Sequence, residues 1–515
     1  MTAPAAVTGT SHQEPGRDIL LLRSLMILAG VMQAVVLVVY SLNRFNHYDT
    51  GIDYGILSQA THLISRGDLN PFNTIYQDWF WRDQFDLAAW GLGFLRFVFP
   101  SSLTLLIGQA LAIAATSVVV MEFALRRCMR LAWQARWAIV GGVSLLTMLN
   151  PWAYEADSFD VHIQTFAALF LVVAVAGFEA RRRVLPYVMV ALALLAGSSS
   201  ILLVLGVGIG MLVLPKLRRQ GVVVAAAGLA WLVVDLVLGA HKGISLAASY
   251  GYLAPGQKAT FLSIVGGMLS NPGTPIRMLA SRYYPIGQLV GYAGIAGILY
   301  PPAGAATVIA VVANGLQSTT SFISLQAGFQ NYPEEMLLLL GLSTVLAILV
   351  KKVGSSAGRT WALSVLFAAA SAGIAVQQAT VDIAIPPTWL QELPASAAAL
   401  SRVHLGRGTE VISTIGVIGR FASHRYVFGW FANPENFPVC TSRIVVILST
   451  AGYEILPPAQ VAAAERSLSS TPGVSRLAVG PGVAAYSLNV VPGHQAFQLG
   501  SGRLLTGAAA SGACS

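Results

Sequence analysis

Long apolar runs separated by short basic clusters dominate the first three quarters of the chain. A polar stretch at 1–17 leads into an apolar run that ends near Leu42, and the next clear run, Leu103–Leu125, stops at a group of arginines. Crossing the hydrocarbon core of a bilayer as a helix takes about 20 apolar residues. The pattern therefore predicts a cytoplasmic tail at 1–17 and a transmembrane bundle of about eleven segments over 18–379. The remaining apolar runs are 137–150, 163–178, 185–197, 201–214, 221–240, 286–299, 303–315, 336–350 and 361–376.

The basic clusters predict which way the segments run. Clusters at 126–130, 181–183, 216–219 and 351–352 fall on one side if the N-terminus is inside, as the positive-inside rule requires. A large loop at 43–101 and the C-terminus are then outside. The number of membrane crossings is less constrained at two interrupted pairs of short apolar segments. If either pair crossed the membrane only once, every later loop would change side. The first pair, within 185–214, is split by Gly197-Ser198-Ser199-Ser200, and its legs are short or re-entrant, since 30 helical residues rise only about 45 Å. The second pair, within 286–315, is split by Pro301-Pro302.

From about Thr380 the long apolar runs give way to short ones between turn residues. This change predicts a small extracytoplasmic α/β domain at 380–500 and a disordered Gly-, Ala- and Ser-rich end at 501–515. Cys440 and Cys514 could pair there in an oxidising compartment or remain two thiols. The fold class is thus mainly α, a polytopic helix bundle with a C-terminal α/β soluble domain. The predicted elements are strands Val411–Ile415, Tyr426–Trp430 and Ile444–Leu448, a helix Pro458–Leu468, and a hairpin of Ser475–Val479 with Val483–Leu488.

Composition excludes several classes of protein. With 55% hydrophobic and 10% charged residues, the chain is not a soluble globular protein, which carries roughly 25% charged residues. The excess of 31 Lys and Arg over 22 Asp and Glu is explained by the basic loops, so we expect no nucleic-acid partner. Motifs for nucleotide hydrolysis, dinucleotide binding, zinc proteolysis and C-x-x-C redox chemistry are absent from the sequence. We therefore expect that no cofactor is required, and a divalent metal has no supporting motif.

The first outer loop concentrates acids and aromatic residues. The spacing of Ile52, Ile56, Leu63 and Ile64 predicts a helix that lies on the bilayer surface and begins near Asp53. A carboxylate in this position is where an enzyme with a lipid-linked donor would need a general base. The alternative is a capping box, Thr50-x-x-Asp53, in which Asp53 only satisfies backbone donors. The other notable residues of the loop are Asp49, Asp68, Asp78, Arg82, Asp83, Asp86, Trp79, Phe80 and Trp81.

The second outer loop again places carboxylates beside aromatic residues. Asp160 and His162 could orient an acceptor or donate a proton, whereas helix capping is the more typical role of Glu155 and Asp157. Within the apolar runs, by contrast, acids are sparse, and Asp235 is the only one that lies deep in such a run. Four cations that this topology places outside could bind a phosphate or simply snorkel to the interface. They are Arg82, Lys258, Arg277 and Arg282.

Several short motifs carry a resemblance to a known family. They are Asp53-Tyr54-Gly55-Ile56-x-x-Gln59, Arg66-Gly67, Asn70-Pro71-Phe72, Gln109-Ala110 and Phe159-Asp160-Val161-His162. Together they resemble the domain of unknown function 2079 family of polytopic membrane proteins. That family is in turn similar to C-class glycosyltransferases, which use a polyprenyl-phosphate sugar and keep a catalytic acid in the first outer loop. By motif position the acid is Asp53, with Asp49 as second choice.

The sequence also departs from the family pattern at two places. Gln84 stands where the family has a histidine, and Gly197-Ser198-Ser199-Ser200 replaces a turn that is usually Lys-Glu-Asp-like. An altered acceptor, or a member that binds without catalysing, would explain both departures.

The resemblance implies a multi-pass protein of the bacterial cytoplasmic membrane that transfers a sugar from a polyprenyl-phosphate donor to an envelope glycan, lipid or protein on the outer face. In this hypothesis Asp53 is the general base, and Arg82 and Arg282 neutralise the donor phosphate. The predicted substrate- and acceptor-binding residues are Asp160, His162, Trp79, Trp81 and Gln59. The interrupted pairs favour a rival, a secondary transporter or lipid flippase. A non-catalytic scaffold is the third interpretation.

Overall fold

The protein is described from a computed structural model of the 515-residue chain. The last predicted span at 361–376, the boundary near 380 and most of 501–515 lie outside the residues that the structure describes, as does most of the tail at 1–17. The described residues are 15–75, 77–83, 86–238, 249–256, 259–293, 295–318, 328–353, 395–401, 403, 405–406, 408–431, 436–450, 456–480, 482–492, 495–499, 503–506 and 514.

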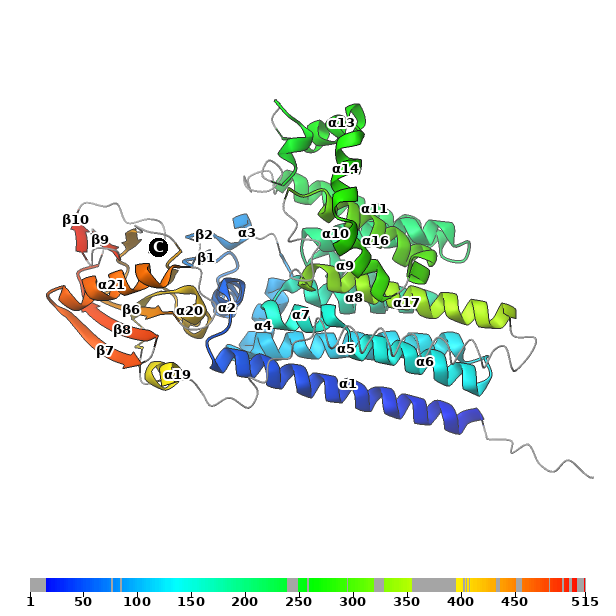
Figure 1. Ribbon diagram of the computed structural model, residues 1–515, viewed down its shortest axis with the longest axis horizontal. Coiled ribbons are helices and arrows are strands. Elements are labelled where there is room, and N and C mark those ends of the chain that lie inside the picture. The colour runs from blue at the N-terminus through cyan, green and yellow to red at the C-terminus, as the bar shows by residue number, and fades with distance from the viewer. Residues whose placement is uncertain are drawn as a thin grey trace, which may run out of the picture.

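Long helices form the bundle (Figure 1). The first half consists of α1 (Pro15–Asn46), α5 (Leu103–Cys128), α6 (Trp133–Met148) and α8 (Ile163–Glu179). The second half consists of α9 (Leu185–Leu194), α10 (Ser198–Val213), α11 (Arg218–Leu238), α15 (Tyr283–Tyr292), η3 (Ile295–Leu299), α16 (Pro301–Gly315) and α17 (Gly328–Val353). Both interrupted pairs are broken helices, as predicted, one at Gly197 and one between α15 and α16.

Four of these helices are long and apolar enough to cross a membrane, and several shorter apolar helices lie among the described residues. The mainly α membrane bundle predicted from the sequence is therefore confirmed. The four long helices include Arg17–Asn46, Leu103–Cys128, Arg218–Leu238 and Gln330–Val353.

Ion pairs join the basic ends of the first helices. Glu122 on α5 pairs with Arg23 of α1 at 3.0 Å and with Arg126 at 2.8 Å, while Arg127 pairs with Glu179 at the end of α8 at 2.6 Å. The start of α1 and the ends of α5 and α8 thus meet at one end of the bundle. The clusters at 126–130 and 181–183 accordingly lie at the same end, as the positive-inside argument requires.

The acids inside α17 correct one expectation. From the sequence, Glu335 precedes an apolar run that begins at Met336, but α17 begins at Gly328 and contains Pro333 in its interior. Glu334 and Glu335 consequently lie within the helix, with 1% and 0% of their surface exposed. Asp235 is therefore not the only acid within an apolar helix.

Short elements occupy the loops at the opposite end. The first loop contains α2 (Ile52–Ile64), a two-stranded ribbon of β1 (Phe72–Asn73) and β2 (Asp78–Trp79), α3 (Phe80–Asp83) and α4 (Ala89–Val98). The second contains α7 (Pro151–Phe159), whose N-cap Asn150 accepts a hydrogen bond from the Ala153 amide at 3.0 Å. Between α11 and α15 lie η2 (Gly251–Leu253), α13 (Phe261–Ser270) and α14 (Gly273–Ser281).

The C-terminal domain is built on a mixed five-stranded sheet of order β4-β3-β6-β8-β7. Strand β3 pairs parallel to β4 and β6, whereas β8 pairs antiparallel to β6 and β7. All the strands and the helix predicted from the sequence are present, at β3 (Thr409–Ser413), β4 (Val427–Gly429), β6 (Arg443–Ser449), α21 (Pro458–Ser470), β7 (Val474–Gly480) and β8 (Val483–Asn489). The elements that were not predicted are α19 (Ala395–Leu400), α20 (Ile415–Phe421), and a second sheet of β5 (Asn436–Pro438), β9 (Gln495–Gln498) and β10 (Arg503–Thr506).

Two contacts decide questions that the sequence left open. Cys440 and Cys514 form a disulfide across 74 positions of the chain. The domain also shares one hydrophobic core with the first loop, in which Tyr54 and Ile56 lie with Val411 and Ile418. Figure 1 accordingly shows α20 beside α2 at one end of the bundle. The loop 43–101 and the C-terminal domain thus lie at the same end, as an even number of crossings between them requires.

Candidate active site at the start of helix α2

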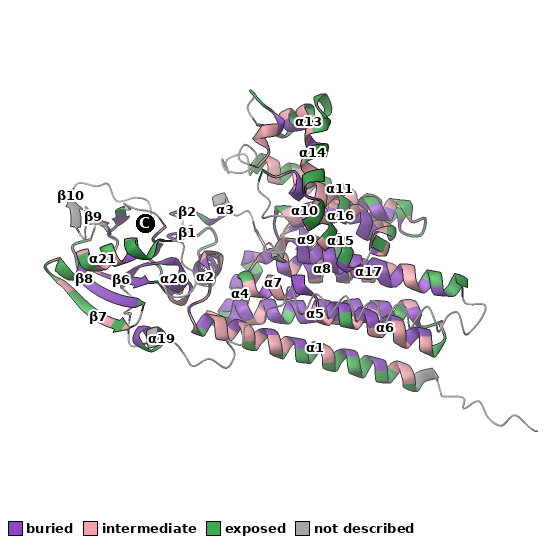
Figure 2. Ribbon diagram, viewed as in Figure 1, coloured by how far each residue is buried: buried purple, intermediate pink, exposed green. Residues whose placement is uncertain are grey.

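Helix α2 carries the predicted catalytic acid but is not a surface helix. The face predicted to meet lipid is buried in protein: Ile56 and Ile64 are 1% and 7% exposed. Figure 2 shows the helix largely in the buried colour, because α4 packs along one side and α20 of the C-terminal domain along another. The prediction of a helix is confirmed, but its placement flat on the bilayer is wrong, since amphipathic spacing does not distinguish lipid from a protein partner.

Asp53 lies in the first turn of α2 and pairs with a histidine from the second loop. Its Oδ2 atom is 3.2 Å from Nε2 of His162, and the two side chains are 32% and 11% exposed. The N-cap of α2 is Gly51, and no side chain of the helix's own start accepts a cap hydrogen bond. The capping-box interpretation of Asp53 is therefore wrong, which leaves this carboxylate partly open to a ligand.

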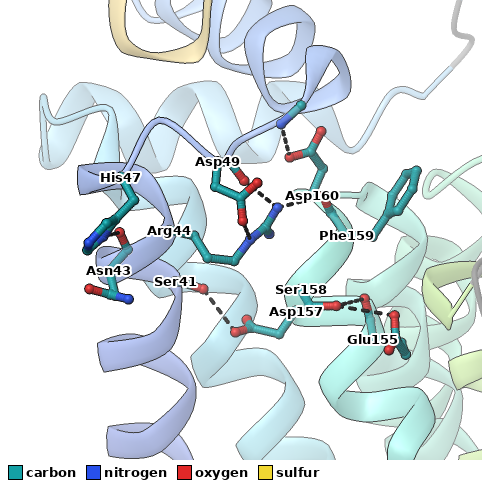
Figure 3. A network of polar contacts seen from close by, with 11 residues as sticks. Ser41, Asn43, Arg44, His47, Asp49, Glu155, Asp157, Ser158, Phe159 and Asp160 are labelled. Carbon is teal, nitrogen blue, oxygen red and sulfur yellow. Dashed lines mark hydrogen bonds and ion pairs between the residues drawn. The ribbon is translucent and has the colours of Figure 1, made fainter. Parts of the chain in front are cut away.

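Asp160 performs the capping from the other loop. Its carboxylate accepts hydrogen bonds from the Gly51 amide at 2.8 Å and the Tyr54 amide at 3.2 Å, as Figure 3 shows in part. A Cβ at Gly51 would approach Oδ2 of Asp160 to 2.6 Å, so a larger residue there would displace the carboxylate. Burial raises the pKa of Asp160 to about 6, against the opposing effect of Arg44. Asp160 thus fixes the backbone on which Asp53 stands, rather than facing an acceptor.

Gln109 of α5 holds the turn that carries both Asp160 and His162. Its amide nitrogen donates to the carbonyls of Ala156 at 3.0 Å and Asp160 at 2.9 Å, and its oxygen accepts from the His162 amide at 2.9 Å. Gln109 is completely buried. The resemblance singled out this residue without assigning it a role, and its contacts make it a positioning residue for the Asp53–His162 pair.

Arg44 and Asp49 form an ion pair beside the site. Nε of Arg44 lies 3.3 Å from Oδ2 of Asp49, and its Nη2 donates to the carbonyls of Asp49 and Phe159 (Figure 3). Asp49 is about half exposed. Because its carboxylate is already compensated by a guanidinium, Asp49 is the weaker of the two candidate bases.

A second buried acid lies below this pair. Asp157 of α7 accepts a hydrogen bond from Ser41 of α1 at 2.9 Å, and burial raises its pKa to about 7. The contact joins α7 to α1. Asp157 therefore has a structural role in this region, although not the helix capping that its position in the sequence favours.

The aromatic residues and Gln59 have mixed placements. Trp79 is 44% exposed and can stack on a ligand, whereas the indole of Trp81 donates to the Leu69 carbonyl at 2.6 Å and packs edge-on against Trp90. Gln59 is fully buried and donates to Thr74 at 2.7 Å. We therefore assign Gln59 to the packing of the loop and not to substrate binding.

One of the two predicted phosphate-binding cations, Arg282, lies away from Asp53. Arg282 is 3% exposed, and its guanidinium donates to the carbonyls of Asn314, Gly315 and Gln317 at the end of α16. It caps a helix in a different part of the bundle. The side chain of Arg82 and the whole of Lys258 lie outside the described residues. Nor does the described part of the chain contain a cluster of three His, Cys, Asp or Glu side chains suited to a metal.

The C-terminal domain reaches the site through α20, which sequence reasoning missed. A Cβ at Gly419 would approach Tyr54 Cδ1 to 2.5 Å and Thr50 Oγ1 to 2.7 Å. Helix α20 therefore contacts α2 at its first turn, which carries Asp53. The next residue, Arg420, places its guanidinium 4.7 Å from the centre of the Phe45 ring. Helix α20 is only seven residues long, too short for a distinct periodic signal.

Comparison with known proteins supports the family resemblance. Residues 48–282 match the family model of predicted membrane proteins, DUF2079. This segment holds Asp53, Asp160 and His162, and the predicted resemblance is confirmed over it. No curated protein matches the chain.

Among the solved structures similar to the chain are two of one protein. They are ArnT from Cupriavidus metallidurans bound to undecaprenyl phosphate, at 14% identity and a TM-score of 0.46, and the same protein in the apo state, at 12% and 0.36. Each match covers 90% of this chain and 97% of the other.

Proposed function

We propose that this membrane protein is a glycosyltransferase that moves a sugar from a polyprenyl-phosphate donor to a cell-envelope acceptor, with Asp53 as the general base. The observation that carries the proposal is the contact between Asp53 and His162 at 3.2 Å, made at a helix start that Asp160 caps. Asp53 is the more exposed partner of the pair and is therefore the one that an acceptor can reach. The family resemblance supplies the donor class.

The reaction is a single displacement at the anomeric carbon. The acceptor hydroxyl gives its proton to Asp53 as its oxygen forms the new bond to that carbon. The bond from the same carbon to the phosphate oxygen breaks, and polyprenyl phosphate leaves with the bonding electrons. One base suffices and no second carboxylate acts as nucleophile, so the configuration inverts. His162 holds the Asp53 carboxylate in place, and Trp79 offers an exposed ring for stacking.

The sidedness that the reaction needs is supported by charge and by redox chemistry. The basic clusters after α5 and α8 meet at the bundle end opposite Asp53, which makes that end cytoplasmic under the positive-inside rule. The Cys440–Cys514 disulfide lies in the domain on Asp53's end and is typical of an oxidising compartment. We therefore propose that the site lies on the outer face of the bacterial cytoplasmic membrane.

The variant Asp53→Asn tests the proposal. It removes the base and keeps the size and the contact to His162, so we expect sugar transfer to fall at least 100-fold, since general-base catalysis contributes 10²- to 10⁴-fold. Membranes containing the protein are incubated with a radiolabelled polyprenyl-phosphate sugar, and label entering envelope material is counted. The matched control is Asp68→Asn, an exposed acid of the same loop whose carboxylate accepts a hydrogen bond from the nearby Asn70 amide at 3.2 Å. Equal transfer by Asp53→Asn and wild type would refute the assignment.

A second candidate function, ion-coupled transport, is favoured by the acids of α17. Three carboxylate oxygens of Glu334 and Glu335 are buried and have no hydrogen-bond partner among the residues that the structure describes. Ionisable groups inside a bundle often mark ion pathways. In proteoliposomes loaded with a fluorescent polyprenyl lipid, a transporter would lose proton-driven lipid movement in Glu335→Gln and retain it in Asp53→Asn. The transferase proposal instead expects sugar transfer to be lost in Asp53→Asn and retained in Glu335→Gln.

A further inference from the structure

A group of basic side chains lies at the other end of α2, away from Asp53. His62 lies one turn after Ser58 on the same face of α2, and Arg66 follows just after the C-cap of the helix, Ser65. Arg96 of α4 is buried beside them and donates to Ser58 Oγ at 2.9 Å and to Ser423 Oγ of the C-terminal domain at 2.8 Å. The domain's turn at 423–425 therefore lies against this end of α2.

The group has no acidic counterpart among the residues that the structure describes. The next residue of the turn, His424, joins Arg66 and Arg96 as a basic neighbour of His62. Burial and then these neighbours lower the pKa of His62 to about 4, with no carboxylate acting in the opposite direction. Arg66 is exposed, and no ion pair joins Arg66, Arg96 or His424 to a described acid. With its pKa near 4, His62 is uncharged near neutral pH, so the positive charge of the patch comes from Arg66 and Arg96.

An exposed aromatic helix face adjoins this patch. Helix α4 turns Leu92 and Arg96 toward α2, while Trp90, Phe94 and Phe97 are 44%, 69% and 68% exposed on the rest of its surface. The candidate span α5 begins five residues after α4 ends. Helices with an aromatic face next to a span characteristically lie in the membrane interface. With α4 in the interface, we expect Arg66 and Arg96 to lie at the level of lipid headgroups.

We infer that the charges of Arg66 and Arg96, together with the imidazoles of His62 and His424, form a binding site for the phosphate of an anionic phospholipid, with the aromatic face of α4 packed beside its acyl chains. The donor of the proposed reaction is a poor occupant of this site. Asp53 and His62 are nine residues apart on one helix, which is about 13 Å along its axis, whereas the donor phosphate is bonded to the reacting carbon. The inference is independent of the proposed transfer, because it does not involve Asp53.

Lipid binding to the full-length protein in a non-ionic detergent tests this site. Phosphatidylglycerol is titrated against diacylglycerol with the same acyl chains, and bound lipid is quantified by native mass spectrometry. We expect tighter binding of phosphatidylglycerol, weakened about fivefold by Arg66→Gln, the equivalent of about 1 kcal/mol for one basic residue near a lipid surface. Adding His424→Gln should weaken binding further. The control Arg466→Gln removes an exposed arginine of α21 and should leave binding unchanged.

Several results would overturn the inference. Equal affinity of wild type and Arg66→Gln/His424→Gln for phosphatidylglycerol would exclude these basic side chains, and equal binding of diacylglycerol would exclude phosphate recognition. Competition by inorganic phosphate or undecaprenyl phosphate, without binding of phosphatidylglycerol, would reassign the source of the phosphate. A thermal midpoint matching wild type in the absence of lipid shows that the double variant is folded. Loss of lipid binding with Asp53-dependent transfer intact would separate this site from the proposed function.

Discussion

Replacement of Asp160 by asparagine should release the start of α2. The carboxylate accepts two backbone hydrogen bonds, from Gly51 at 2.8 Å and from Tyr54 at 3.2 Å. The asparagine side chain has the same shape and keeps one acceptor oxygen, but it turns an NH2 group toward the second backbone N–H. The backbone of residue 160 remains in place, because Gln109 binds its carbonyl at 2.9 Å. The perturbation is therefore confined to the cap.

The expected magnitude follows from these bonds. A hydrogen bond to a charged group contributes about 1.5–3 kcal/mol, and losing a helix N-cap costs about 0.5–2 kcal/mol. A loss of about 2 kcal/mol for opening the first turn of α2 corresponds to roughly 30-fold faster amide exchange. Global unfolding is a poor readout, because the neutral amide also removes the cost of burying the Asp160 charge, which is the cause of its raised pKa of about 6.

Hydrogen–deuterium exchange in nanodiscs at pH 7.5 measures the effect directly. Exchange of the amides of Gly51 and Tyr54 should accelerate in Asp160→Asn. The matched control is Asp157→Asn, which removes a buried carboxylate that contacts Ser41 and not α2. Unchanged exchange at 51–54 in a folded Asp160→Asn protein would show that the cross-loop cap contributes nothing. Equal acceleration in Asp157→Asn would show that the effect is not specific to the cap.

Three further predictions concern the C-terminal domain. Gly419→Val should separate α20 from α2 at a cost of about 1–3 kcal/mol of stability, because the new Cβ would meet Tyr54 Cδ1 at 2.5 Å. Limited proteolysis should then release the C-terminal domain faster than in the wild type. The control Gly408→Val, with open space around it, should leave the rate of release unchanged. Burial raises the pKa of Glu410 to about 7 from an ordinary 4.5. The contribution of the protonated carboxyl to stability is therefore complete below about pH 4.5 and lost as pH rises through about 7. Between pH 5 and 8 the thermal midpoint of Glu410→Gln should fall less steeply than that of the wild type, and parallel profiles would contradict this. Cys440→Ser should cost about 4 kcal/mol of domain stability, because the lost disulfide closes a loop of 74 positions. Dithiothreitol should lower the denaturant midpoint of the wild type to that of the variant and leave the variant's own midpoint unchanged. An effect of dithiothreitol on the variant would show that the lost stability does not come from this disulfide.

Much of the fold is determined locally and was predictable from the sequence. Apolar runs as long as Leu103–Leu125 can be buried only as helices in lipid or in a bundle. In the C-terminal domain, short runs between turn residues correctly predicted β3, β6 and the β7–β8 hairpin. The motif positions of Asp53 and His162 singled out both members of the closest acid–base contact at the site, although the sequence does not state that they touch.

The tertiary structure alone decided how these residues act. Asp53 and His162 are separated by 109 positions, as are Gly51 and Asp160, and hydrophobic periodicity carries no information on which loops meet at that distance. The same limit explains why α2 was assigned to the bilayer surface: its apolar face is satisfied equally by lipid or by α20, and only packing selects between them. Sequence by itself thus determined the bundle and the candidate acid. Only the tertiary structure made Asp160 a helix cap and brought the C-terminal domain to the site. The physical reason is that apolar surfaces are buried, and backbone donors are paired, between segments that are distant in the sequence.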